Sequence, residues 1–483
     1  MSTSRDFAGG PAARYLLLVG VTLLIAIGLL MAFSTTSGEA VIREVSQQGQ
    51  QTPAQGSAIS AFLSGVKLSA FESGFMQLAY LILGAILALL ISRIDYHNLI
   101  RYAVPAGALV IAGLIAVFFF PATLGAHRWI PLGPITIQPS ELAKPVLLII
   151  GASAFSALRS RTAPKEKFAL RDWIVPALFI GLMLALIIVE PDMGTTVILG
   201  VGLAGAWLLC DLPLRYPVGL GAIGAVVMAI RLAISSLFSS DKSYGVARIT
   251  TFIETWTSGQ PGFQNLQAQY ALAGGGLTGV GPGLSRQKYS WLTQAQSDFI
   301  LAIVGEELGF LGALAVILSF VLILVCGMRI AARAKDRLGR SLAGGAIILL
   351  VFQAVLNIFA VTSLIPVTGK PLPFVTAGGT SLVTSLSLIG IVLSVSRYGA
   401  GRPAREMARP ASRFSLIVGG EAPAPTTARK RPVADNDPGK KLPKKKKRAD
   451  RRGPKGKKEE EHEDSIEWRW DSGTHLSGPG SRR

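Results

Sequence analysis

Residues 294–310 read QAQSDFILAIVGEELGF, and this stretch places three carboxylates in or beside a long apolar run. Asp298 stands at the head of the run, whereas Glu306 and Glu307 lie inside it. Charged side chains are costly in the hydrocarbon core of a bilayer, so ionisable residues within a spanning segment are functional candidates. The stretch therefore predicts a membrane helix with chemistry at the end that carries Asp298.

The rest of the chain has the composition of a protein that crosses the membrane many times. Of its 483 residues, 50% are hydrophobic and 16% are charged, against about 25% charged in soluble domains, and the mean hydropathy is +0.46. Several apolar stretches are long enough to cross a bilayer at about 1.5 Å per residue. We expect an all-α fold with ten transmembrane helices, at residues 14–34, 71–92, 101–120, 141–158, 172–189, 194–210, 214–237, 298–327, 341–364 and 380–397.

Basic residues predict the orientation of this fold. An even number of spans puts both termini on one side of the membrane. Lys and Arg crowd the links between spans four and five and between spans eight and nine, and Arg93 and Arg101 flank the link between spans two and three. By the positive-inside rule, we expect a plasma-membrane protein with both termini in the cytoplasm. The first apolar run has no small-residue cleavage site after it, which favours a retained helix over a signal peptide.

The segments between and beyond the spans predict the domain organisation. Residues 1–13 form a short cytoplasmic N-terminus, and residues 14–397 form one membrane domain. Its outer loops fall at 35–70, 121–140 and 238–297, and the last, between spans seven and eight, is long enough to suggest a function. Residues 398–483 form a low-complexity tail that we expect to be disordered.

The net charge of +19 is concentrated in this tail. Residues 401–483 contain 22 Lys and Arg against 12 Asp and Glu, which gives +10. The basic run is either a solvated charge block or a site of attraction to anionic inner-leaflet lipid, worth about 1 kcal/mol per basic residue near the surface. A nucleic-acid partner is not expected, because no folded reader accompanies the run.

Cysteines and histidines do not predict a metal site. Cys210 and Cys326 both lie at or near the ends of apolar runs, where buried thiols are more common than a disulfide. The four histidines are scattered and have no ligand spacing.

Asp298 itself has two interpretations. It is either an N-terminal acid that complements the helix dipole, worth about 0.3–1 kcal/mol, or part of a functional cleft. On a helix Ala302, Gly305 and Glu306 share its face. Because two of these residues are small, the second interpretation predicts an open, acidic cleft wall.

Further charged residues cluster beside three other segments. In HRWIPLGPITIQPSELAKP, residues 127–145, Glu141 and Lys144 are three apart and meet on one helix face, either as an intrahelical ion pair or, with Arg128, as a phosphate-binding group. Asp192 in EPDMGTT caps a helix or lines the same cavity.

The segment IPVTGKPLPFVTAGGTS, residues 365–381, contains Lys370 among three prolines and three glycines and cannot form a regular helix. Non-helical backbone at a membrane is tolerated where protein buries it or a water-filled cavity lies beside it. The glycine-rich AGGGLTGVGPG, residues 273–283, has neither the spacing nor the context of a nucleotide-binding loop.

Taken in order, these stretches resemble the SEDS family, the group that contains FtsW and RodA. The matching stretches are HRWIPLG with QPSELAK, EPDMGTT, the pair Gln287-Lys288, SDFILAIVGEELG and LIPVTGKPLPFVTAGGTS, and the resemblance covers nearly all of residues 14–397. It implies a ten-helix peptidoglycan glycosyltransferase that polymerises lipid II, a disaccharide-peptide on undecaprenyl pyrophosphate, with no need for ATP.

The resemblance also implies roles for the residues. Asp298 matches the family's essential aspartate and would act as the general base. Glu306 and Glu307 would support the site, and a divalent cation, magnesium or manganese, is compatible with the pyrophosphate. The substrate-binding residues would be Arg128, Glu141, Lys144, Asp192, Gln287, Lys288 and Lys370.

Two features qualify this assignment within the family. Gln294 and Gln296 stand where the family commonly has Glu and His, so any catalytic help from those groups is absent or comes from elsewhere. The GEELG motif and the long tail favour the FtsW-like, septal branch over the elongation branch. The expected partners are a class B penicillin-binding protein, which is a transpeptidase, and other division proteins.

Two alternatives stay open. A lipid II flippase would use the same charged cavity, although a carrier places its key charges near the midplane of the membrane. A scaffold would recruit the synthase without catalysis.

Overall fold

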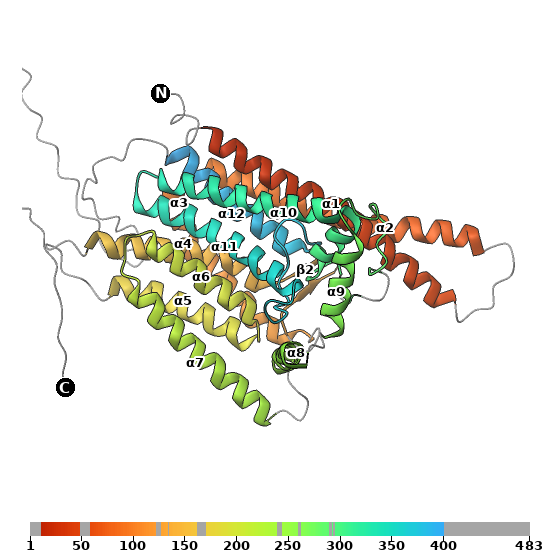
Figure 1. Ribbon diagram of the computed structural model, residues 1–483. Coiled ribbons are helices and arrows are strands. Elements are labelled where there is room, and N and C mark those ends of the chain that lie inside the picture. The colour runs from red at the N-terminus through yellow and green to blue at the C-terminus, as the bar shows by residue number, and fades with distance from the viewer. Residues whose placement is uncertain are drawn as a thin grey trace, which may run out of the picture. The chain divides into compact units, whose positions relative to one another are not determined.

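The computed structural model describes residues 11–48, 58–121, 127–133, 135–161, 171–238, 244–258, 262–288, 292 and 295–399. The tail predicted at 398–483 lies outside the described residues from 400 onward, as do residues 1–10. The described part is almost wholly helical, with one short β-hairpin (Figure 1).

The helices follow one another along the chain with few interruptions. Their bounds are α1 Pro11–Gln48, α2 Ala58–Arg93, α3 Tyr96–Ala116, α4 Pro139–Arg161, α5 Arg171–Val189, α6 Met193–Leu208, α7 Arg215–Phe238, α8 Tyr244–Ser258, α9 Phe263–Gly274, α10 Ile300–Ala332, α11 Arg337–Val361 and α12 Gly379–Tyr398. A 3-10 turn, η1, follows α3 at Val117–Phe119. Strands β1 (Ile130–Leu132) and β2 (Ile135–Ile137) pair antiparallel, with Ile130 opposite Ile137.

Seven of the described helices are long and apolar enough to cross a membrane, namely those in α1, α2, α3, α4, α10, α11 and α12. Shorter apolar helices occur at Ile174–Val189, Met193–Leu208 and Arg215–Val227, where the sequence predicts the fifth, sixth and seventh spans. The structure therefore confirms a multi-pass helical protein, and the count of ten stays a prediction.

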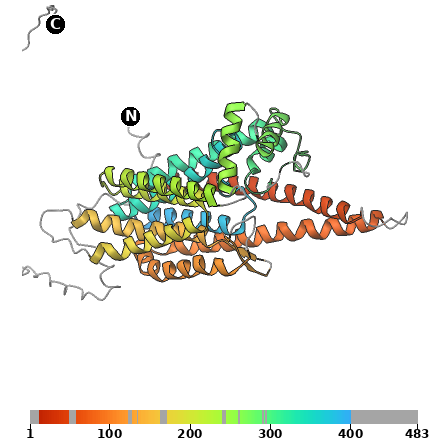
Figure 2. The ribbon, with the colours of Figure 1, turned by 90° about the horizontal axis from the view of Figure 1, so that it is seen from below.

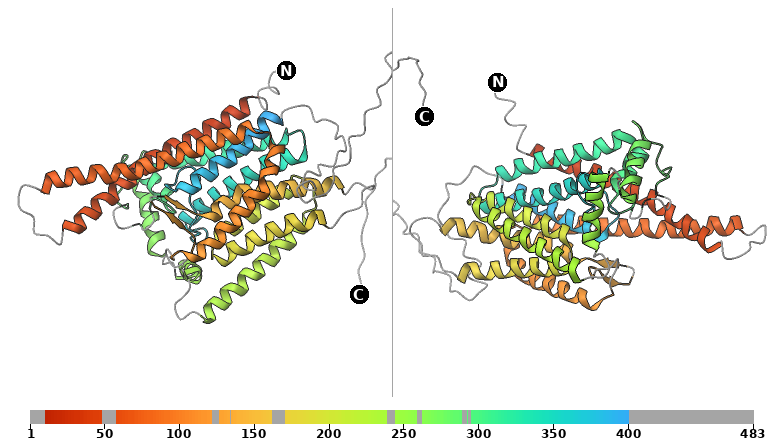
Figure 3. Two further views of the ribbon diagram at one scale, coloured as in Figure 1. Left: turned by 180° about the vertical axis from the view of Figure 1, so that it is seen from behind. Right: turned by 60° about the horizontal axis from the view of Figure 1, so that its bottom comes forward.

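Two of the predicted loops between spans contain helices. Helix α1 continues to Gln48 and α2 already begins at Ala58, so most of the predicted loop 35–70 is helical. These two helices run beyond the rest of the bundle as a long hairpin (Figure 3). The glutamine and serine content suggested a loop, but within the bounds of these two helices the segment holds no proline to stop them. The predicted loop 238–297 likewise contains α8 and α9.

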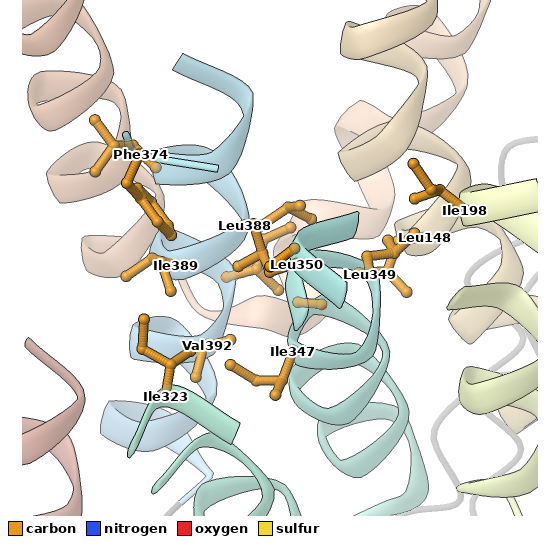
Figure 4. Close-up of a cluster of buried hydrophobic side chains, with 14 of the residues drawn as sticks. Leu148, Ile198, Ile323, Ile347, Leu349, Leu350, Phe374, Leu388, Ile389 and Val392 are labelled. Atoms are coloured by element: carbon orange, nitrogen blue, oxygen red, sulfur yellow. The ribbon is translucent and has the colours of Figure 1, made fainter. Parts of the chain in front are cut away.

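The central part of the core lies between α4, α6, α10, α11 and α12, and side chains of α1 and α3 extend it. Figure 4 shows aliphatic side chains of these helices meeting around Ile347 and Leu388. Small residues bring the backbones close, since a methyl group at Gly390 of α12 would press on the backbone of Ala88 in α2. In a membrane such close packing, rather than release of water, holds helices together.

Helix α10 is broken at Gly309, which has φ 68° and ψ −168°. The span predicted at 298–327 corresponds to α10, and a short helix precedes the break inside it. The glycine-rich loop after α9 satisfies the backbone groups freed there. Val280 and Gly281 donate to the carbonyls of Glu306 and Glu307 at 3.0 and 3.1 Å. Phe310 in turn donates to the carbonyl of Gly276 at 2.8 Å. The loop after α9, residues 275–288, thus supports the break, and we call it the splint. It prevents unpaired backbone groups in the membrane.

This splint makes a stability prediction. Gly279 has φ +81°, and a methyl group there would overlap the backbone carbonyl of Glu307. We expect Gly279→Ala to lower the free energy of unfolding by on the order of 2 kcal/mol or more. Gly276→Ala is the matched control, because Gly276 also has a positive φ (+54°) but nothing lies within 4 Å of the position that its methyl group would take.

The control should lose only the left-handed backbone penalty, about 1–2 kcal/mol. Thermal unfolding of the two purified variants in detergent measures the difference. Equal losses in both would show that the contact with Glu307 contributes nothing.

The bundle has two chemically different ends. Helix α1 begins and α12 ends at one of them, which we call the basic end (Figure 1). At the other, the loop end, lie the β-hairpin, α8 and α9, and the α1–α2 hairpin projects from it (Figure 2). The candidate site lies at the loop end.

Candidate active site at the loop end

Asp298 lies in a turn, residues 295–299, directly before α10. Three successive carbonyls of this turn accept hydrogen bonds from elsewhere in the fold. The amide of Ala377 donates to the Gln296 carbonyl at 3.3 Å and the Thr376 hydroxyl to the Ser297 carbonyl at 3.2 Å. The side chain of Asn357 donates to the carbonyl of Asp298 itself at 2.8 Å. The backbone that carries Asp298 is therefore fixed.

The carboxylate of Asp298, unlike its backbone, is not held by hydrogen bonds within the described residues, and its residue is partly exposed. Burial raises the pKa of the Asp298 carboxyl above its ordinary range. The positive charges that limit this rise are, in order, those of Arg248, Lys370 and Arg128. An unpartnered carboxylate with a raised pKa is a stronger base than an ordinary aspartate, and it faces a cationic surrounding.

Lys370 reaches this surrounding from the loop between α11 and α12. Its ammonium contacts the Asp192 carboxylate at 2.5 Å and donates to the Thr195 hydroxyl at 2.6 Å. Both charged side chains are buried, at 3% and 1% exposure. Although burial opposes ionisation, Lys370 and then Arg128 hold the pKa of Asp192 well below its usual range. Asp192 also caps α6 through the Thr195 amide at 3.2 Å, so both sequence interpretations of Asp192 are compatible with its position.

Arg128 comes from the segment before the β-hairpin. Its guanidinium donates to the carbonyls of Glu190 and Pro191 at 3.2 and 2.5 Å. These bonds attach it to the turn between α5 and α6, which also carries Asp192. The structure thus brings Arg128, Asp192, Lys370 and Asp298 to one place.

Glu141 and Lys144 lie deeper, in α4. The Lys144 ammonium contacts both carboxylate oxygens of Glu141 at 2.7 Å, so the ion pair predicted from their spacing is present. A third acceptor, the Gln353 side chain, also lies at 2.7 Å. Lys144 is 2% exposed, and its three protons match these three acceptors.

Lys288, Glu306 and Glu307 carry polar contacts between the splint and α10. Lys288 pairs with Glu307 at 2.9 Å, and Glu307 accepts a hydrogen bond from the Gly283 amide at 3.0 Å. Glu306 accepts from the Arg286 amide at 2.8 Å. The side-chain oxygen of Gln287 is buried without a partner among the described residues. These charges hold the glycine-rich loop against the broken helix.

The predicted open face on α10 is wrong. Ala302 is fully buried, and a methyl group at Gly305 would overlap the side chain of Leu272 in α9. The small residues serve close packing of α9 rather than a cleft.

Glu190 is a buried acid beside the site. It is fully buried, and neither carboxylate oxygen has a hydrogen-bond partner among the described residues. Burial, and then the negative charge of Asp192, raise the pKa of Glu190 to about 8. An acid that binds its proton more tightly when folded loses stability as the pH rises from its ordinary pKa of 4.5 to about 8.

We therefore expect Glu190→Gln to unfold like the wild type near pH 4.5. It should become the more stable protein as the pH rises, by at most about 1.4 kcal/mol per pH unit. Melting temperatures across this range provide the measurement, and Glu254→Gln, at an exposed position of α8, is the control. Parallel curves for Glu190→Gln and wild type would contradict the assignment of a protonated buried acid.

Metal binding has no visible donor set in the described part of the chain. There, no group of three or more His, Cys, Asp or Glu side chains could hold an ion. Asp192 and Glu141 are already paired with lysines.

Several site residues escaped the sequence analysis. Arg248 in α8, the first cation acting on Asp298, lay in a segment predicted to be a loop. Gln353 and Asn357 could have been found, because two amides four residues apart share one face of an apolar span. Nothing in the sequence distinguished Glu190 as a site residue apart from the neighbouring Asp192.

Known proteins resemble this chain in sequence and fold. The family model described as "Cell cycle protein", for FtsW, RodA and SpoVE, matches residues 57–400. A Geobacter metallireducens protein named "Probable peptidoglycan glycosyltransferase FtsW" is 34% identical over 345 residues, which cover 69% of this chain and 88% of that protein.

Two solved structures share the fold. One, described as "Structural coordination of polymerization and crosslinking by a peptidoglycan synthase complex", matches with a TM-score of 0.57 and 23% identity, covering 79% of this chain and 96% of that chain. The RodA rod-shape determining protein of Thermus thermophilus matches with a TM-score of 0.52 and 22% identity, covering 82% and 99%.

Proposed function

The chain belongs to the cell cycle protein family of FtsW, RodA and SpoVE, and from this we propose that it is a peptidoglycan glycosyltransferase. It polymerises lipid II into glycan strands at the outer face of the plasma membrane, in its FtsW-like branch at the division septum. The observation that carries the proposal is the carboxylate of Asp298, which is unpartnered among the described residues and surrounded by cations.

The proposed chemistry is a single displacement. A sugar hydroxyl of one substrate attacks the anomeric carbon of the other, and the bond from that carbon to the pyrophosphate oxygen breaks. The hydroxyl proton passes to the Asp298 carboxylate, and undecaprenyl pyrophosphate leaves as an anion. General base catalysis of this kind contributes about 10²–10⁴-fold.

Cations stabilise the leaving group in this proposal. Arg248, Lys370 and Arg128 act on the same region as Asp298, and fixed positive charges placed where negative charge develops lower the barrier. Asp192 holds Lys370 through their buried ion pair. Glu141, Lys144, Gln287 and Lys288 complete the proposed set of substrate-binding residues. A magnesium or manganese ion could also bind the pyrophosphate in this step, and loss of activity on addition of a chelator would reveal it.

The distribution of charge supports the proposed orientation. The described basic end carries Arg93, Arg101, Arg159, Arg333, Lys335, Arg337, Arg340 and Arg397. Under the positive-inside rule this end is cytoplasmic. We propose ten spans, with both termini inside, the loop end outside and the basic tail near anionic lipid.

The proposed partner is a transpeptidase. The solved complex that shares this fold is described as coordinating polymerization and crosslinking. We infer that this chain pairs with a class B penicillin-binding protein and other division proteins.

The test uses the purified chain, with and without such a partner, and fluorescent lipid II. Formation of glycan polymer supports the enzyme. Movement of the headgroup across liposomes without polymer would show a carrier instead, and neither activity would leave a scaffold. Addition of a chelator to the same reaction decides whether a divalent cation takes part.

A further inference from the structure

Helix α11 presents two buried amides to the site, one turn apart. Gln353 is 3% exposed and Asn357 is 1% exposed, and both lie on the face of α11 that meets the segment after it. Gln353 accepts from the Lys144 ammonium at 2.7 Å and donates to the Pro371 carbonyl at 2.8 Å. Asn357 donates to the carbonyls of Asp298 and Lys370, both at 2.8 Å.

The orientation of both amides follows from their partners. A backbone carbonyl can only accept a hydrogen bond, and an ammonium can only donate one. The nitrogen of Asn357 must therefore face the two carbonyls, and the oxygen of Gln353 must face Lys144. The usual ambiguity between the oxygen and nitrogen of an amide does not arise at these positions.

Asn357 donates both of its side-chain amide protons to backbone carbonyls, one of Asp298 and one of Lys370, which carry opposite charges. Because one nitrogen serves both carbonyls, the chain at Asp298 and the chain at Lys370 are held side by side although they are far apart in sequence. The oxygen of the same amide is buried without a partner among the described residues. An unsatisfied buried polar atom is unfavourable for stability, and such violations are expected where function requires them.

We propose that Asn357 is a positioning residue that fixes the distance between the base Asp298 and the cation Lys370, with Gln353 extending the same connection to Lys144. This inference rests on the proposed function, since it assumes that Asp298 accepts a proton while Lys370 faces the leaving group. A displacement of reacting groups by about 1 Å can cost about 10²-fold in rate.

The experiment replaces the amide by a side chain of similar size. Asn357→Leu removes both donors, and Asn357→Asp keeps the shape but puts an oxygen against the two carbonyls. For each variant we expect kcat for lipid II polymerisation to fall by about 10²-fold per folded molecule. The KM should change little, and the acid limb of the pH–rate profile should shift. Ser341→Ala is the matched control, because it removes a buried side-chain bond of 2.8 Å, to Ala206, from the opposite end of the same helix.

A readout independent of activity separates this inference from the proposed function. The amide of Ala377 donates to the carbonyl of Gln296, in the turn that carries Asp298. Hydrogen exchange in the peptide that contains Ala377 should rise in the Asn357 variants and not in the control. A variant with wild-type kcat and pH profile would overturn the inference even if its melting temperature fell. If the wild type makes no polymer, the proposed function fails, and unchanged exchange would then refute the connection on its own.

Discussion

Asp298→Asn is expected to lower the rate of glycan polymerisation by about 10²–10⁴-fold, the contribution of a general base. The substitution keeps the shape of the side chain and removes its ability to accept the hydroxyl proton. The carboxylate has no hydrogen-bond partner among the described residues. The backbone carbonyl that Asn357 holds is unchanged. The fold should therefore survive, and the melting temperature should stay close to that of the wild type.

The pH profile of the wild type provides a second readout of the same group. Burial raises the pKa of Asp298, and the base must be deprotonated to work. Activity should therefore fall as the pH decreases through this raised value, at a higher pH than for an exposed aspartate. Polymer is quantified on gels with fluorescent lipid II.

Asp211→Asn is the matched control for the polymerisation assay. Asp211 lies at the basic end, where it pairs with Arg337 and Arg340 at 3.4 and 3.3 Å. This variant should retain full activity. Undiminished polymer from Asp298→Asn, with the partner present, would exclude Asp298 as the base.

The sequence predicted the elements of this fold better than their ends. Apolar length located the helices, because a bilayer demands about 20 apolar residues for each span. It did not reveal that α1 and α2 continue through most of 35–70, because the composition there is polar. Apolar length also did not predict the break at Gly309, because this break depends on tertiary contacts with a separate loop. Such a break is stable only because the segment from Gly276 to Gly281 supplies hydrogen-bond partners.

The candidate site was predictable where residues act through local spacing. The contact of Glu141 with Lys144 follows from their separation of three residues on one helix. The contact of Lys370 with Asp192 does not, because it joins two turns from different parts of the chain. Glu306 and Glu307 were predicted as supporting residues, but the sequence did not name their partners. In the structure their oxygens accept hydrogen bonds from loop amides.

The second large effect is expected at the pair of Lys370 and Asp192. Lys370→Met leaves the Asp192 carboxylate buried without its closest positive charge, and removal of one partner from a buried pair costs about 3–5 kcal/mol. Melting temperature and detergent stability should fall accordingly. Lys335→Met is the control, since Lys335 is exposed at the basic end and surface substitutions stay within about 0.5 kcal/mol.

A double variant separates the structural role of Lys370 from its proposed catalytic role. In Lys370→Met with Asp192→Asn, no unpaired charge stays buried, so much of the lost stability should return. Polymerisation should not return, because the cation that faces the leaving pyrophosphate is still missing. Recovery of stability and activity together would mean that Lys370 serves only to neutralise Asp192, and that Arg128 and Arg248 alone stabilise the leaving group. Stability and rate are measured on the wild type, Lys370→Met, Lys335→Met and the double variant. Together they distinguish a lysine that only stabilises the fold from one that also takes part in the reaction.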